Sequence, residues 1–182
     1  MKKFYLLLAL LLTCFMGGQA QTGGKTVLLY GLRDYSVFAL SPNGQWATGA
    51  FTNGLGSYYA FSWNLVTGDC VLLSGGNNQS VGYGVSNDGT VVGTYSSSEV
   101  SENGAVVECA AYCTPDGTWH ILGGANGGYA VGGQALCVSG NGEYIGGAMT
   151  ISGRWSPVVW KNGEFYKNLC IRDGGSLQQG AV

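Results

Sequence analysis

Ser41-Pro42-Asn43-Gly44 returns as Ser86-Asn87-Asp88-Gly89 and again as Ser139-Gly140-Asn141-Gly142. Each copy separates two short runs of small and apolar residues, and the second run always contains glycine. Asn-Gly and Asp-Gly favour two-residue hairpin turns, because both central residues of such a turn have positive φ. The pairs therefore predict three β-hairpins, at Asn43-Gly44, Asp88-Gly89 and Asn141-Gly142.

Outward from each turn, the pattern continues into a second hairpin, so that one repeat holds four strands. The turn serines lie 45 residues apart between positions 41 and 86, then 53 residues apart up to 139. A four-stranded unit of this length is typical of a β-propeller blade. The sequence predicts an all-β fold of three four-stranded antiparallel repeats, blades of an incomplete β-propeller, at about 35–75, 80–124 and 129–170.

The individual strands are predicted from short apolar runs between turn residues. A strand at 26–32 precedes the first repeat. The repeats then hold strands at 35–40, 45–51, 58–65 and 69–73, at 81–85, 90–95, 105–113 and 118–122, and at 130–138, 143–151, 155–160 and 164–169.

The last residues, 174–182, resemble 77–85, which lead directly into a turn serine. They predict the start of a fourth repeat. Because propellers have 4 to 8 blades and open arrays expose strand edges, two interpretations remain. We favour a chain that is a fragment of a longer protein over one that completes itself by self-association.

The N-terminal twenty residues have the pattern of an export signal: a basic start, an apolar run from Phe4 to Phe15, and Gly18-Gln19-Ala20 as a cleavage site. Cleavage after Ala20 leaves 21–182 as the β-repeat domain, which we expect to be extracellular, periplasmic or on the outer surface. The alternative is a lipoprotein signal with Cys14 as the lipidated residue. Only in that case is membrane attachment expected.

Charge excludes one class of partner. Without the first twenty residues, 6 basic residues remain against 10 acidic ones, a net charge of −4. Nucleic-acid binding requires basic residues that neutralise phosphates, and no basic stripe is present. Glycine accounts for 33 of 182 residues, about 18% against a typical ~7%, which fits many tight turns.

The repeat resembles the extracellular HAF-type repeat of bacterial exported proteins, over roughly residues 35 to 170. The residues that carry the resemblance are Ala39 to Gly44, Gly49, Ala60 to Trp63, Gly68 and Leu72-Leu73 in the first copy, with matching positions such as Val85 to Gly93, Ala111-Tyr112 and Gly117 in the second, and Val138-Ser139, Ile145-Gly146 and Val159-Trp160 in the third. The resemblance implies a secreted β-repeat module, and it carries over no catalytic residue.

No catalytic, cofactor-binding or metal-binding set is predicted. His120 is the only histidine and occupies a repeat position held elsewhere by Val71 and Tyr166, which favours a structural role. The carboxylates are scattered, and those to test first in an enzyme are Asp34, Glu99, Glu102 and Glu108. Five cysteines follow the signal, at 70, 109, 113, 137 and 170, and we expect buried small hydrophobes rather than one or two disulfides.

Aromatic side chains are the candidate ligand contacts. Trp46 and Tyr144 follow the turn in their repeats, and Tyr58 and Trp155 lie in nearby strands. If exposed they offer flat apolar surfaces for sugar rings or proteins, although a role in capping the core is favoured. The leading hypothesis is a non-enzymatic module that binds a protein or a glycan. The alternatives are a glycan-active hydrolase or lyase with its site on the repeat axis or in missing sequence, and a structural spacer.

Overall fold

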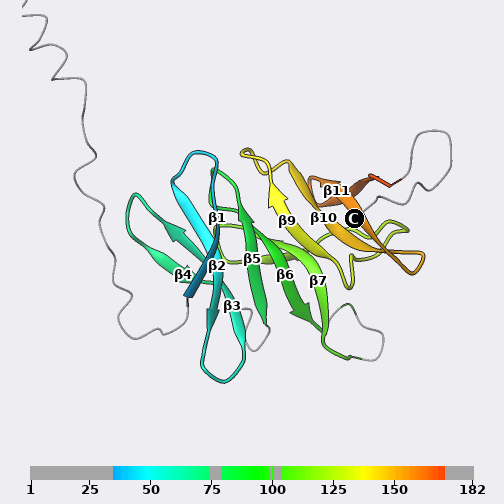
Figure 1. Ribbon diagram of the computed structural model, residues 1–182, viewed down its shortest axis with the longest axis horizontal. Helices are drawn as coiled ribbons and strands as arrows, with labels where there is room; N and C mark the ends of the chain where they lie inside the picture. The colour runs from blue at the N-terminus through cyan, green and yellow to red at the C-terminus, as the bar shows by residue number, and fades with distance from the viewer. Residues whose placement is uncertain (1–34, 74–78, 99, 101–103, 171–182) are drawn as a thin grey trace, which may run out of the picture.

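The computed structural model describes residues 35–73, 79–98, 100 and 104–170, and within these ranges the chain is all-β. Its twelve strands form three four-stranded antiparallel sheets in simple up-and-down order, each a propeller-type blade (Figure 1). The first blade contains β1 (Tyr35–Leu40), β2 (Trp46–Thr52), β3 (Tyr58–Asn64) and β4 (Cys70–Leu72). The second contains β5 (Ser80–Val85), β6 (Val91–Ser97), β7 (Val107–Cys113) and β8 (Trp119–Ile121), and the third β9 (Gln134–Val138), β10 (Tyr144–Ile151), β11 (Arg154–Lys161) and β12 (Glu164–Asn168).

The predicted strands are confirmed to within a few residues at every position that the structure describes. The largest difference is β9, which begins at Gln134 rather than at 130. The preceding residues make isolated bridges instead, including Cys109 with Val131 and Gly123 with Tyr129. The predicted strand at 26–32, the signal with Cys14, and the start of a fourth repeat at 174–182 lie outside the described residues.

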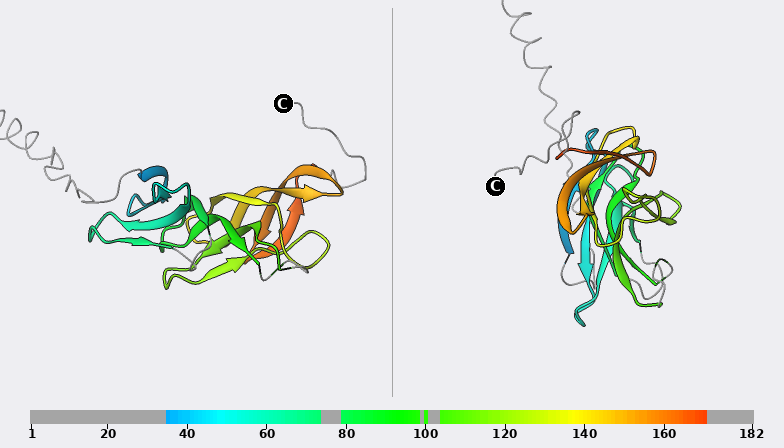
Figure 2. Two further views of the ribbon diagram at one scale, coloured as in Figure 1. Left: turned by 90° about the horizontal axis from the view of Figure 1, so that it is seen from below. Right: turned by 90° about the vertical axis from the view of Figure 1, so that its right-hand side faces the viewer.

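The blades follow one another along the long axis of the molecule (Figure 2). The first strand of the second and third blades makes the contacts with the blade before it: β5 packs against β1, β2 and β3, and β9 packs against β5, β6 and β7. Successive residues of a strand point to opposite faces of its sheet. The second blade therefore has one face toward the first blade and the opposite face toward the third.

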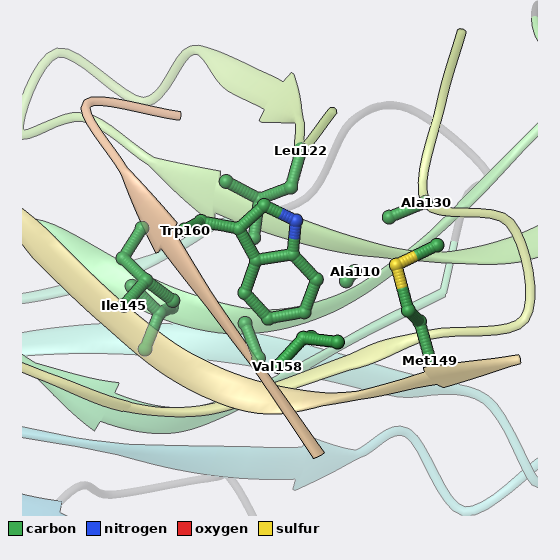
Figure 3. Close-up of a cluster of buried hydrophobic side chains, with 9 residues drawn as sticks. Ala110, Leu122, Ala130, Ile145, Met149, Val158 and Trp160 are labelled. Atoms are coloured by element: carbon green, nitrogen blue, oxygen red, sulfur yellow. The ribbon is translucent and has the colours of Figure 1, made fainter. Parts of the chain in front are cut away.

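Two apolar clusters fill the spaces between blades. Ala60 and Leu73 of the first blade pack with Val85, Val91 and Cys113 of the second. The larger cluster joins the second and third blades around Trp160, which Figure 3 shows between Leu122 and Val158. Val158 and Trp160 lie on the same face of β11 and are both in this core, with exposed fractions of 1% and 0%.

The prediction of two-residue hairpins at the three repeat turns is wrong. Only the glycine of each pair has positive φ, for example Gly44 at 69°. In each turn the glycine N–H donates to the carbonyl of the turn serine, and the serine hydroxyl donates to the following Asn or Asp side chain. The serine thus opens a four-residue turn that ends in a left-handed glycine, a longer loop than the pair alone suggests. Asn162-Gly163 does form a two-residue turn, with φ of 51° and 84°.

A β-bulge recurs in the first strand of all three blades, at Phe38, Tyr83 and Leu136, each three residues before its turn serine. The bulge brings a backbone carbonyl against the second strand, where only glycine fits. A Cβ on Gly49, Gly93 or Gly147 would lie 1.8, 1.8 or 2.0 Å from the carbonyl oxygens of Ser36, Val81 and Gln134 respectively. This explains why the second strand of every repeat carries a glycine.

Candidate functional site

The three repeat turns lie next to one another and are joined by hydrogen bonds. The Asn43 backbone N–H donates to Asn87 Oδ1 at 2.9 Å, and Asn43 Nδ2 donates to the Asn87 carbonyl at 3.2 Å. Asn87 N–H in turn donates to the Gly140 carbonyl at 2.9 Å. This turn face is therefore a continuous, rigid surface across all three blades.

Two side chains that come shortly after a repeat turn, those of Trp46 and Thr90, lie at the gap to the next blade. Ala47, Val91 and Ile145 all pair with the residue directly before their turn serine, which makes their predecessors Trp46, Thr90 and Tyr144 equivalent. In the first gap Trp46 packs against the core cluster and fills the space over Gly89, where an added Cβ would lie 2.9 Å from the indole.

The second gap is open, because Thr90 is much smaller than the tryptophan at the equivalent position. A cleft of about 340 Å³ lies there between the second and third blades. Its lining comes from both blades: Asp88, Thr90 and Tyr112 from one, and Asn141, Gly142, Glu143, Ile145, Asn162 and Gly163 from the other. The cleft thus combines one aromatic ring with carboxylate and amide groups, and its base is formed by Ile145 of the core.

Tyr112 is held firmly in the wall of this cleft. Its strand pairs it with Val92 on one side and His120 on the other, and the His120 ring stacks on the Tyr112 ring with centroids 4.9 Å apart. Gly163 approaches the ring edge, since a Cβ there would lie 3.3 Å from a Tyr112 ring carbon. His120 is exposed and positions the tyrosine in this arrangement.

The carboxylates of the cleft are also fixed in place. Burial raises the pKa of Asp88, but hydrogen bonds from the Ser86 hydroxyl and the Thr90 N–H outweigh it, so the pKa lies below its usual value. Glu143 accepts from Asn141 Nδ2 at 3.3 Å and pairs with Lys161 Nζ at 3.2 Å. Hydrogen bonds with Tyr144 and Glu143 raise the pKa of Lys161. The lowered pKa of Asp88 keeps its carboxylate ionised at neutral pH, as a hydrogen-bond acceptor in the cleft.

The four aromatic residues proposed from the sequence do not form one surface. Trp46 is half-buried against the core, as the core-capping interpretation expects. Tyr58 lines a separate apolar hollow of about 290 Å³ with Phe38 and Tyr83, whose rings stack 5.9 Å apart. Tyr144 and Trp155 are exposed on the far face of the third blade.

Sequence reasoning missed Thr90 and Tyr112. The signal for Thr90 was present, because two of the three repeats place an aromatic residue two positions after the turn glycine and the remaining repeat has none there. It was hidden by a one-residue difference in turn length: Leu40 pairs with Ala47, seven residues on, whereas Val85 pairs with Val91, six residues on.

All five cysteines that follow the predicted signal are free thiols. Cys109 and Cys113 are fully buried, as predicted for small hydrophobes, whereas Cys137 is exposed and Cys70 and Cys170 are half-buried. Burial raises the pKa of Cys109 to about 11, with a contribution from Glu108, and that of Cys113 to about 12, with a contribution from Asp116.

Among the described residues, no group of three or more His, Cys, Asp or Glu side chains is placed to hold a metal ion. Of the carboxylates first considered for catalysis, Asp34, Glu99 and Glu102 lie outside these residues, and Glu108 is exposed at the start of β7. The described parts of the chain also contain no helix long and apolar enough to cross a membrane.

No family model and no curated protein matches this chain. Two solved structures are similar in fold: TolB from Acinetobacter baumannii, with 14% identity and a TM-score of 0.44, and a putative TolB from Agrobacterium tumefaciens, with 18% identity and a TM-score of 0.45. Each match covers 67% of this chain, but only 28% and 40% of the respective TolB chains. The chain thus spans less than half the length of either structure.

Proposed function

We propose that this chain is an exported, non-enzymatic β-repeat module of the HAF type that binds a glycan in the cleft between its second and third blades. The observation that carries the proposal is the substitution of Thr90 for the tryptophan that closes the first gap. One gap of an otherwise repeated interface is open, and its lining is polar.

The chemistry of the lining suits a sugar. A sugar ring offers an apolar C–H face and a rim of hydroxyls, and Tyr112 supplies a fixed ring and a phenol group. Asp88 and Glu143 supply carboxylate acceptors for hydroxyl donors, while the amides of Asn141 and Asn162 both donate and accept. A few polar groups fixed around an apolar floor are the usual basis of specificity in small-molecule sites.

Rigidity supports binding rather than catalysis. The cleft walls are strands and tight turns whose hydrogen bonds are already made within the protein, so little ordering is left to occur on binding. The carboxylates are held as acceptors, with the pKa of Asp88 lowered, whereas a general acid requires a raised one.

The test is a screen of neutral and acidic oligosaccharides against the wild-type chain, followed by titration of each hit against two variants. Thr90→Trp fills the cleft as Trp46 fills the first gap, and it should weaken binding at least 10-fold. Thr90→Ser is the matched control and should bind within about 2-fold of wild type. Equal binding by Thr90→Trp, or release of a cleaved product, would contradict the proposal.

A further inference from the structure

One buried side-chain polar atom of the described residues has no hydrogen-bond partner, the indole Nε1 of Trp63. Burial of an unpaired N–H is unfavourable, and almost every such group in a folded protein is satisfied. Trp63 lies in β3, where it pairs with Ala47 and Cys70. Its face of the sheet is opposite to the one that carries Ala60 toward the second blade.

The other two blades show where an indole N–H at a blade interface is directed. Trp119 Nε1 of the second blade donates to the Leu73 carbonyl of the first at 3.0 Å. Trp160 Nε1 of the third blade donates to the Gly123 carbonyl of the second at 2.8 Å. In both cases the acceptor lies one or two residues beyond the last strand of the preceding blade.

Trp63 holds the same place in its blade as Trp160. Trp160 pairs with Ile145, which in turn pairs with the residue before its turn serine, and Trp63 has the same relation to Ala47. Trp63 is thus oriented to donate to the last strand of a preceding blade. No such strand is among the described residues.

A leucine marks the end of every fourth strand. Leu73, Leu122 and Leu169 each donate a backbone hydrogen bond to the third strand of their own blade, at 2.8 to 2.9 Å. The exposed fractions of Leu73 and Leu122 are 4% and 0%, because the next blade covers them, whereas that of Leu169 is 58%. At both interfaces between described blades, the leucine after the fourth strand is buried, and an indole N–H of the next blade donates to a carbonyl at or next to that leucine.

We propose that the segment 26–29 of this chain is the missing partner and lies as a last strand against the Trp63 face of the first blade. Phe38 and Tyr83 are the equivalent bulged residues, which makes Tyr35 equivalent to Ser80. Leu73 lies seven residues before Ser80, and Leu28 lies seven residues before Tyr35. Leu28 thus takes the place of Leu73, and the Leu29 carbonyl, one residue on, takes the place of the Gly123 carbonyl that accepts from Trp160.

The apolar character of both surfaces supports this assignment. The Trp63 face also carries Phe61, Leu72 and Cys70, which pair across β3 and β4. The segment offers Val27, Leu28 and Leu29. Leu28 lies seven residues before Tyr35 at the start of β1, and Leu73 lies seven residues before Ser80 at the start of β5. The connection from the segment to β1 is therefore as long as the one that joins the first blade to the second, and the described strands need not rearrange.

The experiment measures hydrogen exchange of the tryptophan indole N–H groups by NMR, with the Trp63 signal assigned through Trp63→Phe. In the wild-type chain the Trp63 N–H should exchange at least 10-fold more slowly than that of the exposed Trp155. Leu28→Asp should abolish this protection, and the milder Leu28→Ala should reduce it at least 3-fold. Thr26→Asp is the control, because its counterpart Val71 is 57% exposed, and it should leave exchange within about 2-fold of wild type.

Three results would overturn the proposal. The first is a Trp63 N–H that exchanges as fast as that of Trp155 in the wild-type chain. The second is protection that survives both Leu28 substitutions. The third is protection that is lost on 100-fold dilution, which would assign the Trp63 face to a second copy of the chain.

Discussion

The side chain of Asn87 accepts a hydrogen bond from the backbone N–H of Asn43, 2.9 Å away and 44 residues earlier in the chain. It is a direct polar link between the turns of adjacent blades. Asn87→Ala leaves that backbone N–H to water, while the bond from Asn43 Nδ2 to the backbone carbonyl of residue 87 can persist, so we expect the free energy of unfolding to fall by about 1 kcal/mol. Urea denaturation measures it, with Asn126→Ala in an exposed loop as the control, expected to lie within ~0.5 kcal/mol of wild type. Equal effects of the two substitutions would contradict the structural role of the link.

The bulge in each first strand predicts a large effect at Gly93. A Cβ at this position would lie 1.8 Å from the Val81 carbonyl oxygen, a backbone atom that cannot move without breaking the sheet. Gly93→Ala should therefore destabilise the protein by roughly 3 kcal/mol or more, at the upper end of single substitutions. The measurement is the midpoint and slope of chemical denaturation.

Gly54→Ala separates this close approach from the general effect of adding a side chain to glycine. Gly54 has a φ of 76° and open space around its Cα, so the substitution costs only left-handed backbone strain of about 1 kcal/mol. If Gly54→Ala were as destabilising as Gly93→Ala, the carbonyl contact would not be the cause.

The strand order was predictable because, within each repeat, strands that are neighbours in the sequence are also neighbours in the sheet. Alternating apolar residues and turn residues define hairpins of about 15 to 23 residues, and neighbouring hairpins pair in sequence order. The bulges were not predictable, because a bulged residue such as Phe38 has the same character as its neighbours. The recurring glycines Gly49, Gly93 and Gly147 could be read from the sequence. The cause of their recurrence is a carbonyl group on the neighbouring strand that leaves no room for a Cβ, and the sequence does not show this contact.

The cleft was harder to predict than the fold, since it depends on the lack of a large aromatic side chain at one position of the second repeat. Trp46 is conspicuous in the sequence and fills its gap, whereas Thr90 is inconspicuous and leaves a gap open. A search for aromatic residues therefore selected the closed interface. Tyr112 reaches the cleft from a strand 22 residues further along, and only the blade geometry brings it there.

Asp88 makes the stability of the second turn depend on pH. Its pKa is lowered in the folded state, so its contribution to stability is present above the unfolded pKa of about 3.9 and is lost as the pH falls through the folded value. Asp88→Asn places in this turn the residue that the other two turns hold. We expect the variant to be less stable than wild type at pH 7 and the difference to shrink below pH 4.

Urea denaturation at pH 7, 4 and 2.5 checks this prediction. Asp116, whose pKa is lowered chiefly by a hydrogen bond from Thr114, is present in both proteins, so its contribution cancels in the difference. A difference in stability that stays constant or grows toward pH 2.5 would show that the Asp88 carboxylate has no stabilising role in the turn.

The buried cysteines predict a graded pattern of thiol reactivity. Cys113 is fully buried and burial raises its pKa to about 12, so at pH 8 it is both inaccessible and protonated. Only the thiolate reacts with a disulfide reagent. A variant that retains only Cys137, which is exposed, should be labelled at least 100-fold faster than a variant that retains only Cys113. The difference should disappear in denaturant, where both thiols are accessible to the reagent.

If Cys113 reacted as fast as Cys137 in the folded chain, the interface between the first and second blades would have to open on the timescale of labelling, because Cys113 is part of the cluster that joins them.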